Sequence, residues 1–195
     1  MPFAESTMWK DIERYFLNAR TLVWINPRAI KRYIGFIPDV VICPLREDGK
    51  VELTAVEVKR TINQSNFNTA LGQCVRFRRF ATNIYLAAHE PIPEGVTDEL
   101  SVVAGEIGVL SINNVGGVNV VREPTRIEQT NASLIETIYH VLHLRTTRWG
   151  PSVDRWKRRR MFRCLFCYKL FDLRRGKCPH CGSSVEDMIR MIDHG

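Results

Sequence analysis

Two carboxylates and an amine lie within one predicted β-hairpin of this sequence. Asp39 precedes an apolar run over residues 40–45, and Glu57 and Lys59 stand near the end of a second apolar run that begins at residue 51. The Asp-Gly pair between the two runs favours a hairpin turn. Because side chains alternate along a strand, Glu57 and Lys59 project from one face, and folding the hairpin brings Asp39 close to Glu57.

These three groups have a chemical use together. Mg²⁺ binds one or two carboxylates, several waters and the phosphate oxygens of a substrate. It lowers the pKa of a bound water, and a neighbouring ammonium can orient that water and offset phosphate charge. The same residues also suit a surface hairpin with a Glu–Lys pair facing solvent. Against this, Glu57 stands between Val56 and Val58, where a charge needs a partner or a metal. The residues alone leave both interpretations open.

Four cysteines form a second candidate site. Cys164 and Cys167 make one CxxC pair, Cys178 and Cys181 make another, and ten residues separate the pairs. This spacing predicts a zinc ribbon in which four thiolates hold Zn²⁺ tetrahedrally. Since protein fills all four positions, the zinc would be structural. A disulfide pair and a thiol redox site are the competing interpretations; the lack of a secretion signal and of a thioredoxin-like unit argues against them.

The hairpin motif resembles that of the PD-(D/E)xK nuclease superfamily. The matching residues are Pro38-Asp39, then 17 residues, then Glu57-Val58-Lys59. The resemblance covers roughly residues 5–125 and implies an α/β, restriction-endonuclease-like fold, a mixed β-sheet flanked by helices. It implies that Asp39 and Glu57 bind Mg²⁺ or Mn²⁺ and that Lys59 positions or activates the water. Gln73 and Glu13 are the positions that fit the Gln of the next helix and the Glu of the first helix in many members.

Hydrophobic periodicity predicts the elements around the hairpin. Helical spacing marks residues 6–20, with Ser6 as the N-cap, and an apolar segment at 22–25 suits a strand. After the hairpin we expect a helix over 66–80, a parallel strand over 83–88, a helix over 97–104, strands over 107–112 and 118–122, and a helix over 130–144. The expected organisation is a nuclease-like domain over 1–147, a basic linker over 148–160 and the zinc ribbon over 161–195.

Positive charge is concentrated near the C-terminus. The 195 residues carry a net charge of +7, and residues 145–177 hold twelve Lys and Arg against two Asp. This favours a polyanionic partner, although a basic segment can also serve only as a solubilising tail. The residues expected to bind nucleic acid are Lys157, Arg158, Arg159, Arg160, Arg174 and Arg175. The aromatic residues among them can stack on bases or pack the ribbon.

No apolar run of 18 residues and no secretory signal occur, so we expect no membrane span and a cytoplasmic, intracellular location. The expected function is a Mg²⁺-dependent DNA nuclease, an endonuclease, with RNA left open as a substrate. The alternative is a catalytically inactive nucleic-acid-binding or adaptor protein of the same fold. Members of the superfamily are often dimers, which leaves a homodimer open, although nothing in the sequence marks an interface.

Overall fold

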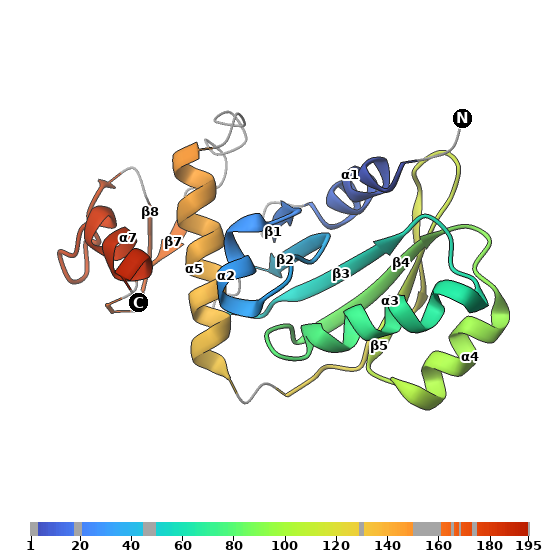
Figure 1. Cartoon of the computed structure of the whole chain (residues 1–195). Helices are drawn as coiled ribbons and strands as arrows, with labels where there is room; N and C mark the ends of the chain where they lie inside the picture. Colours follow the sequence, from blue (N-terminus) through green and yellow to red (C-terminus); the bar gives the residue numbers. More distant parts are fainter. Residues whose placement is uncertain are drawn as a thin grey trace.

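The computed structural model describes residues 4–17, 21–44, 50–128, 131–149, 161–164, 166–167, 169–172 and 175–194. Its main part is an α/β domain built on one six-stranded sheet (Figure 1). The strands of this sheet are β1 (Thr21–Ile25), β2 (Val40–Pro44), β3 (Thr54–Lys59), β4 (Asn83–His89), β5 (Ile107–Ile112) and β6 (Val118–Arg122). All six agree with the apolar runs in the sequence. The turn predicted between β2 and β3 falls in residues 45–49, outside the described residues.

The sheet is mixed, as the helix–strand alternation predicts. The strands stand side by side in chain order, from β1 to β6. The pairs β1–β2, β2–β3 and β5–β6 are antiparallel, whereas β3–β4 and β4–β5 are parallel. The three parallel strands therefore end at the same edge of the sheet, and β3 has a hydrogen-bonded neighbour on each side.

Helices cover both faces of this sheet. The helices of the main domain are α1 (Glu5–Phe16), η1 (Arg28–Ile30), α2 (Lys31–Ile34), α3 (Gln64–Phe77), α4 (Glu94–Val103) and α5 (Ala132–Trp149). On one face, Met8 and Ile12 of α1 pack with Val40, Val56 and other strand residues. On the opposite face, α3, α4 and α5 bury a larger cluster (Figure 1). The alternation of side chains along each strand decides which residues reach which layer.

Some helix boundaries differ from those expected. Helix α1 begins at Glu5 with Ala4 as N-cap, so Ser6 lies inside the helix, where no side-chain capping bond is made. A carboxylate in the first turn suits the positive end of the helix dipole. Helix α5 (expected over 130–144) runs from Ala132 to Trp149 and so continues past residue 147, the expected end of the domain. Residues 150–160 of the predicted linker lie outside the described residues.

The C-terminal module contains β7 (Met161–Arg163) and β8 (Leu170–Asp172), which form an antiparallel pair, and α7 (Val185–His194). Its core contains Cys164, Phe171, Cys178 and Met188. Helix α7, which the sequence analysis did not anticipate, contacts α5. None of the described helices combines the length and the apolar character that crossing a membrane requires.

Candidate functional site

The register of β2 against β3 brings the predicted carboxylates together. Val40 stands opposite Val56, and the same register continued by one residue sets Asp39 opposite Glu57. The backbone N–H of Val58 donates a hydrogen bond of 2.7 Å to Oδ2 of Asp39. Asp39 is thus fixed to β3 across the strand pair, as the folded hairpin predicts.

Glu57 lies in the interior of the protein. Its neighbours Val56 and Val58 point into the layer beneath α1, whereas Ala55 belongs to the layer beneath α3. By alternation Glu57 and Lys59 therefore share the α3 side of the sheet. Glu57 is only 4% exposed, so the interpretation as a solvent-facing Glu–Lys pair is wrong for this carboxylate.

Lys59 provides the partner that a buried carboxylate needs. Its Nζ donates to Oε1 of Glu57 at 2.6 Å, and the lysine itself is partly buried. Burial alone would lower the pKa of Lys59, but the bond to Glu57 and the charges of Glu57 and Asp39 raise its pKa overall. The amine is therefore a charged ammonium at neutral pH.

The two carboxylates oppose each other's ionisation. Burial raises the pKa of Asp39, although the bond from Val58 and the charge of Lys59 act in the other direction. Burial and then the charge of Asp39 raise the pKa of Glu57 to about 7, against the effect of Lys59. A divalent cation between such groups would favour their charged forms against the effect of burial, because it would offset both negative charges.

Helix α1 supplies a third carboxylate near this pair, from Glu5. Oε1 of Glu5 accepts a bond of 3.2 Å from the backbone N–H of Arg60, directly after Lys59. The charge of Glu5 also contributes to the pKa values of Asp39 and Glu57. Glu13 lies eight residues further along α1, about 12 Å along the helix axis. The first-helix carboxylate that the structure brings to the site is thus Glu5, and a role for Glu13 stays a prediction.

Helix α3 approaches the site from the larger layer. Cys74 of α3 is fully buried, and its burial, followed by the charge of Glu57, raises the pKa of its thiol. Gln73, beside it, is half-buried, and its Oε1 is a buried atom for which the described residues provide no hydrogen-bond donor. A buried amide oxygen without a donor implies a ligand or a water. The structure thus places Gln73 on the helix that borders the site, and its role stays a prediction.

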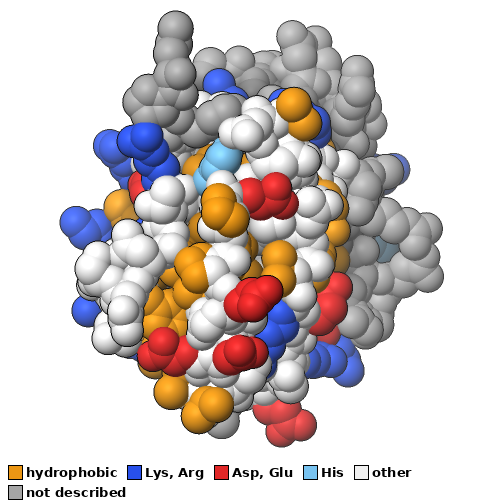
Figure 2. Space-filling view, turned by 90° about the vertical axis from the view of Figure 1, so that its right-hand side faces the viewer, with side chains coloured by type: hydrophobic (Ala, Val, Ile, Leu, Met, Phe, Trp, Pro, Cys, Tyr) orange, Lys and Arg blue, Asp and Glu red, His pale blue; other side chains and the backbone are white. Residues whose placement is uncertain are grey.

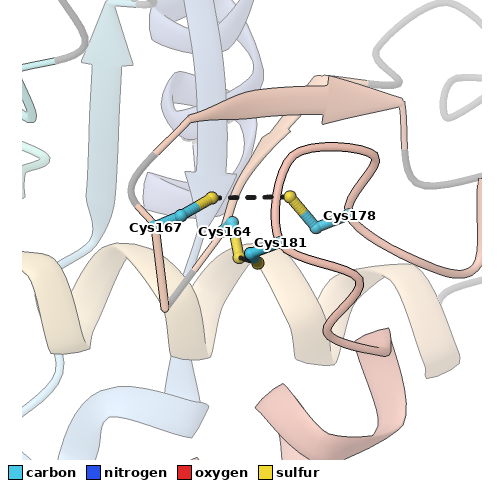
Figure 3. A group of neighbouring side chains, drawn as sticks. All are labelled: Cys164, Cys167, Cys178 and Cys181. Atoms are coloured by element: carbon cyan, nitrogen blue, oxygen red, sulfur yellow. Dashed lines mark hydrogen bonds between the residues drawn. The ribbon is translucent and has the colours of Figure 1, made fainter.

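The four cysteines come together in the C-terminal module. Their sulfurs lie within 4.8 Å of one another, and Figure 3 shows them gathered between the two loops that carry the CxxC pairs. The Sγ atoms of Cys164 and Cys181 are 3.4 Å apart, and those of Cys167 and Cys178 are 3.5 Å apart. These four residues can hold a structural metal such as zinc, because four converging sulfurs are the ligand set of closed tetrahedral sites.

The four-cysteine cluster and the pair Asp39 and Glu57 differ in how many ligand side chains they bring together. Among the residues that the structure describes, the four cysteines are the one group of three or more ligand side chains with converging donor atoms. Asp39 and Glu57 bring two carboxylates to neighbouring strands, and a Mg²⁺ site built on them stays a prediction.

Of the residues predicted to bind nucleic acid, Arg175 is described, and its side chain is exposed. Arg174 and residues 157–160 lie outside the described part of the chain.

Comparison of the sequence with models of known protein families and with curated proteins finds no match.

The sequence analysis missed Glu5 because it is an exposed acid at the start of a helix, without an apolar pattern around it to single it out.

Proposed function

We propose that this chain is a divalent-metal-dependent nuclease of the PD-(D/E)xK superfamily, with a restriction-endonuclease-like fold, that hydrolyses phosphodiester bonds in DNA. One observation carries the proposal: Asp39 stands opposite Glu57 on paired strands, and Lys59 contacts Glu57 at 2.6 Å. This cluster, in which Glu57 is buried and Asp39 and Lys59 are partly buried, lies in a mixed sheet that has helices on both faces, which supports the fold assignment.

The residues present fit a Mg²⁺ or Mn²⁺ ion. Asp39 uses Oδ2 for the bond from Val58, and Glu57 uses Oε1 for the bond from Lys59. Each carboxylate thus has a second oxygen outside these bonds. Two crowded, desolvated carboxylates are unfavourable unless a cation joins them. When bound, the ion would lower the pKa of a water and polarise the scissile phosphate.

The side chains have separate tasks in this scheme. Asp39 and Glu57 hold the cation, and the backbone of β3 fixes Asp39 in place. Lys59, a charged ammonium, orients the attacking water and offsets the negative charge that develops on the phosphate. It does not serve as the base, since its pKa is raised.

Other surfaces must hold the rest of the substrate. Figure 2 shows the side of the molecule that lies to the right in Figure 1. On the described part of this side, Asp and Glu side chains are scattered among hydrophobic and neutral groups, and Lys and Arg lie mostly toward the margins of the view. Helix α4 lies on this side and carries the exposed residues Glu94, Asp98 and Glu99. Since these acids repel phosphates, we assign part of the binding to the basic C-terminal segment with its four-cysteine module.

The test is cleavage of DNA by purified protein with Mg²⁺ or Mn²⁺, on a panel of duplex, single-stranded, flap and junction substrates. Lys59→Ala should lower the cleavage rate by about 100-fold or more, because a preorganised cation at the reacting phosphate is lost. Asp39→Asn should do the same by weakening the binding of the ion. Lys10→Ala, at an exposed lysine of α1, is the matched control and should cleave like the wild type.

Two results would decide against the proposal. Equal cleavage by wild type and Lys59→Ala would show that the activity comes from elsewhere. Binding of DNA without cleavage under either metal would favour the alternative, a catalytically inactive nucleic-acid-binding protein of this fold.

A further inference from the structure

The four-cysteine module presents an aromatic ring that its own core does not use. Phe171 is 2% exposed and packs with Cys164, Cys178 and Met188. Phe166, in the first CxxC loop, is 46% exposed. Phe166 and Phe171 thus have different surroundings, and the packing of the module's core explains Phe171 but not Phe166.

The ring of Phe166 stands on a constrained backbone. Its N–H donates to Sγ of Cys164 at 3.4 Å, and the Cys164 N–H donates to the carbonyl of Lys169 at 3.0 Å. These bonds restrain the backbone at Cys164 and Phe166 before any partner arrives. A restrained backbone reduces the conformational entropy that an exposed aromatic residue loses on binding, which suits a recognition group.

Two lysines lie close to the cysteines along the chain. Lys169 follows Cys167 by two residues, and Lys177 directly precedes Cys178; both lysines are exposed. Because the four sulfurs lie within 4.8 Å of one another, the two loops share one small surface. Chain geometry then places the Cα atom of each lysine within about 7 Å of the Cα atom of a cysteine in the cluster.

The charge of the module suits a polyanion even with the metal bound. Four thiolates around one Zn²⁺ leave a net charge of about −2. The sequence from Arg163 to Lys177 holds five Lys and Arg against one Asp, which exceeds this negative charge. The acids Glu186 and Asp187 lie in the first turn of α7. The bond from Ser184, together with the charges of Arg190 and Lys177, lowers the pKa of Asp187, so this acid offsets part of the charge of Lys177.

We infer that the module binds unpaired nucleotides, with Phe166 stacking on a base while Lys169 and Lys177 contact phosphates. In a duplex the bases are already stacked on one another, so an exposed ring has no free base face to cover. A single strand, a flap or a frayed end offers such a face, and stacking on it is tolerant of sequence. The inference rests on the proposed function only in taking nucleic acid as the partner.

The experiment measures binding rather than cleavage. The full chain, with zinc retained and no Mg²⁺ or Mn²⁺ added, is titrated into a fluorescein-labelled 20-nucleotide oligo(dT) strand and into a labelled 20-base-pair duplex, with anisotropy as the readout. Phe166→Ala should weaken single-strand binding by about 5- to 150-fold, the range expected for one base–aromatic stack. It should change duplex binding less than about twofold, and Phe166→Trp should restore the single-strand affinity.

Matched variants separate stacking from other effects. Tyr15→Ala removes a ring of similar exposure, 49%, from α1 and should leave single-strand affinity unchanged. Lys177→Gln should lower the slope of log affinity against log salt by about 0.7 on the single strand. Zinc content and melting temperature of Phe166→Ala should match the wild type, because the ring lies outside the module's core.

Three outcomes would overturn the inference: an equal loss with Tyr15→Ala, an equal loss on duplex and single strand, or no loss with Phe166→Ala. A protein that binds the single strand through Phe166 but never cuts would refute the proposed nuclease and leave this inference standing. A protein that cuts DNA but binds the single strand equally well with Phe166→Ala would refute this inference and leave the proposed nuclease standing.

Discussion

At the scale of single residues, the chemistry of Glu57 is governed by where the sheet places it. A carboxylate that is 4% exposed and stands opposite Asp39 costs free energy when it ionises. Burial raises its pKa to about 7 from an ordinary 4.5. The folded state therefore favours the protonated form, and Glu57 contributes stability below pH 4.5 that is lost as the pH rises through about 7.

Replacing Glu57 by Gln tests this linkage. Between pH 5.5 and pH 8, without added Mg²⁺, the wild type should lose about 2 kcal/mol of unfolding free energy relative to Glu57→Gln. Urea unfolding at the two pH values measures the difference. Glu99→Gln, at an exposed position of α4, should show no such change with pH. If the difference in unfolding free energy between wild type and Glu57→Gln were the same at both pH values, Glu57 would ionise as freely in the folded state as in the unfolded chain.

At the scale of elements, the start of α3 follows the end of β3 after four residues. The side chain of Asn63 accepts from the backbone N–H groups of Ser65 and Asn66, at 3.0 and 3.1 Å. Oδ1 of Asn66 accepts in return from the N–H of Asn63 at 2.9 Å. This capping box fixes where the helix begins and hence how Gln73, three turns away, approaches the site.

Removing the cap should destabilise the protein. Asn63→Ala is expected to lower the unfolding free energy by about 1 kcal/mol, because two helix N–H groups lose their acceptor. Asn68→Ala, an exposed position inside the same helix, is the control and should be neutral or slightly stabilising, since Ala is the better helix former. Urea denaturation followed by circular dichroism gives both values. An equal effect of the two substitutions would show that the box contributes nothing beyond helix propensity.

The elements differ in how far the sequence predicts them. The strands were predictable because their side chains are apolar in short runs bounded by turn residues, as in 83–88. The closeness of Asp39 and Glu57 was predictable because a hairpin fixes which residues face each other. The position of Glu5 was not, since it depends on how a helix packs across a sheet and not on local pattern. Helix α7 did have a local signal: Ser184 donates to Asp187 and caps its N–H, the serine–acid spacing of a helix start.

The division of the molecule into a large and a small core sets how each part responds to metal loss. The cluster beneath α3, α4 and α5 contains many large side chains, such as Phe77, Phe80 and Tyr139, whereas the core cluster of the C-terminal module has four buried residues among those whose burial is described. So small a core cannot offset the entropy of folding by itself. The metal that the four cysteines can hold would supply the missing free energy.

Zinc removal should therefore unfold one part of the molecule only. A chelator with a reductant should abolish amide protection over 161–194 while β3 and β4 keep theirs, as measured by hydrogen exchange. Cys164→Ser should lower the zinc content well below one ion per chain. Cys43→Ser, at a buried cysteine of β2 outside the cluster, should leave the zinc content unchanged. Metal-free wild-type protein with full protection over 161–194 would contradict this division.

The position of β3 has a consequence for any polymer that reaches it. Strand β4 pairs with β3 from Thr54 to Lys59, whereas the β2 pairs end at Val56 and only the bond from the Val58 N–H to Asp39 continues that side. The backbone that carries Glu57 and Lys59 is therefore held mainly by β4, which limits how far it can follow an incoming chain. Because Glu57 is buried and the Lys59 side chain beside it is 20% exposed, a stiff duplex would have to bend or locally open before a phosphate could reach them. The selectivity of the molecule would then be mechanical, favouring nucleic acids that already yield at a nick, a branch or a loose end.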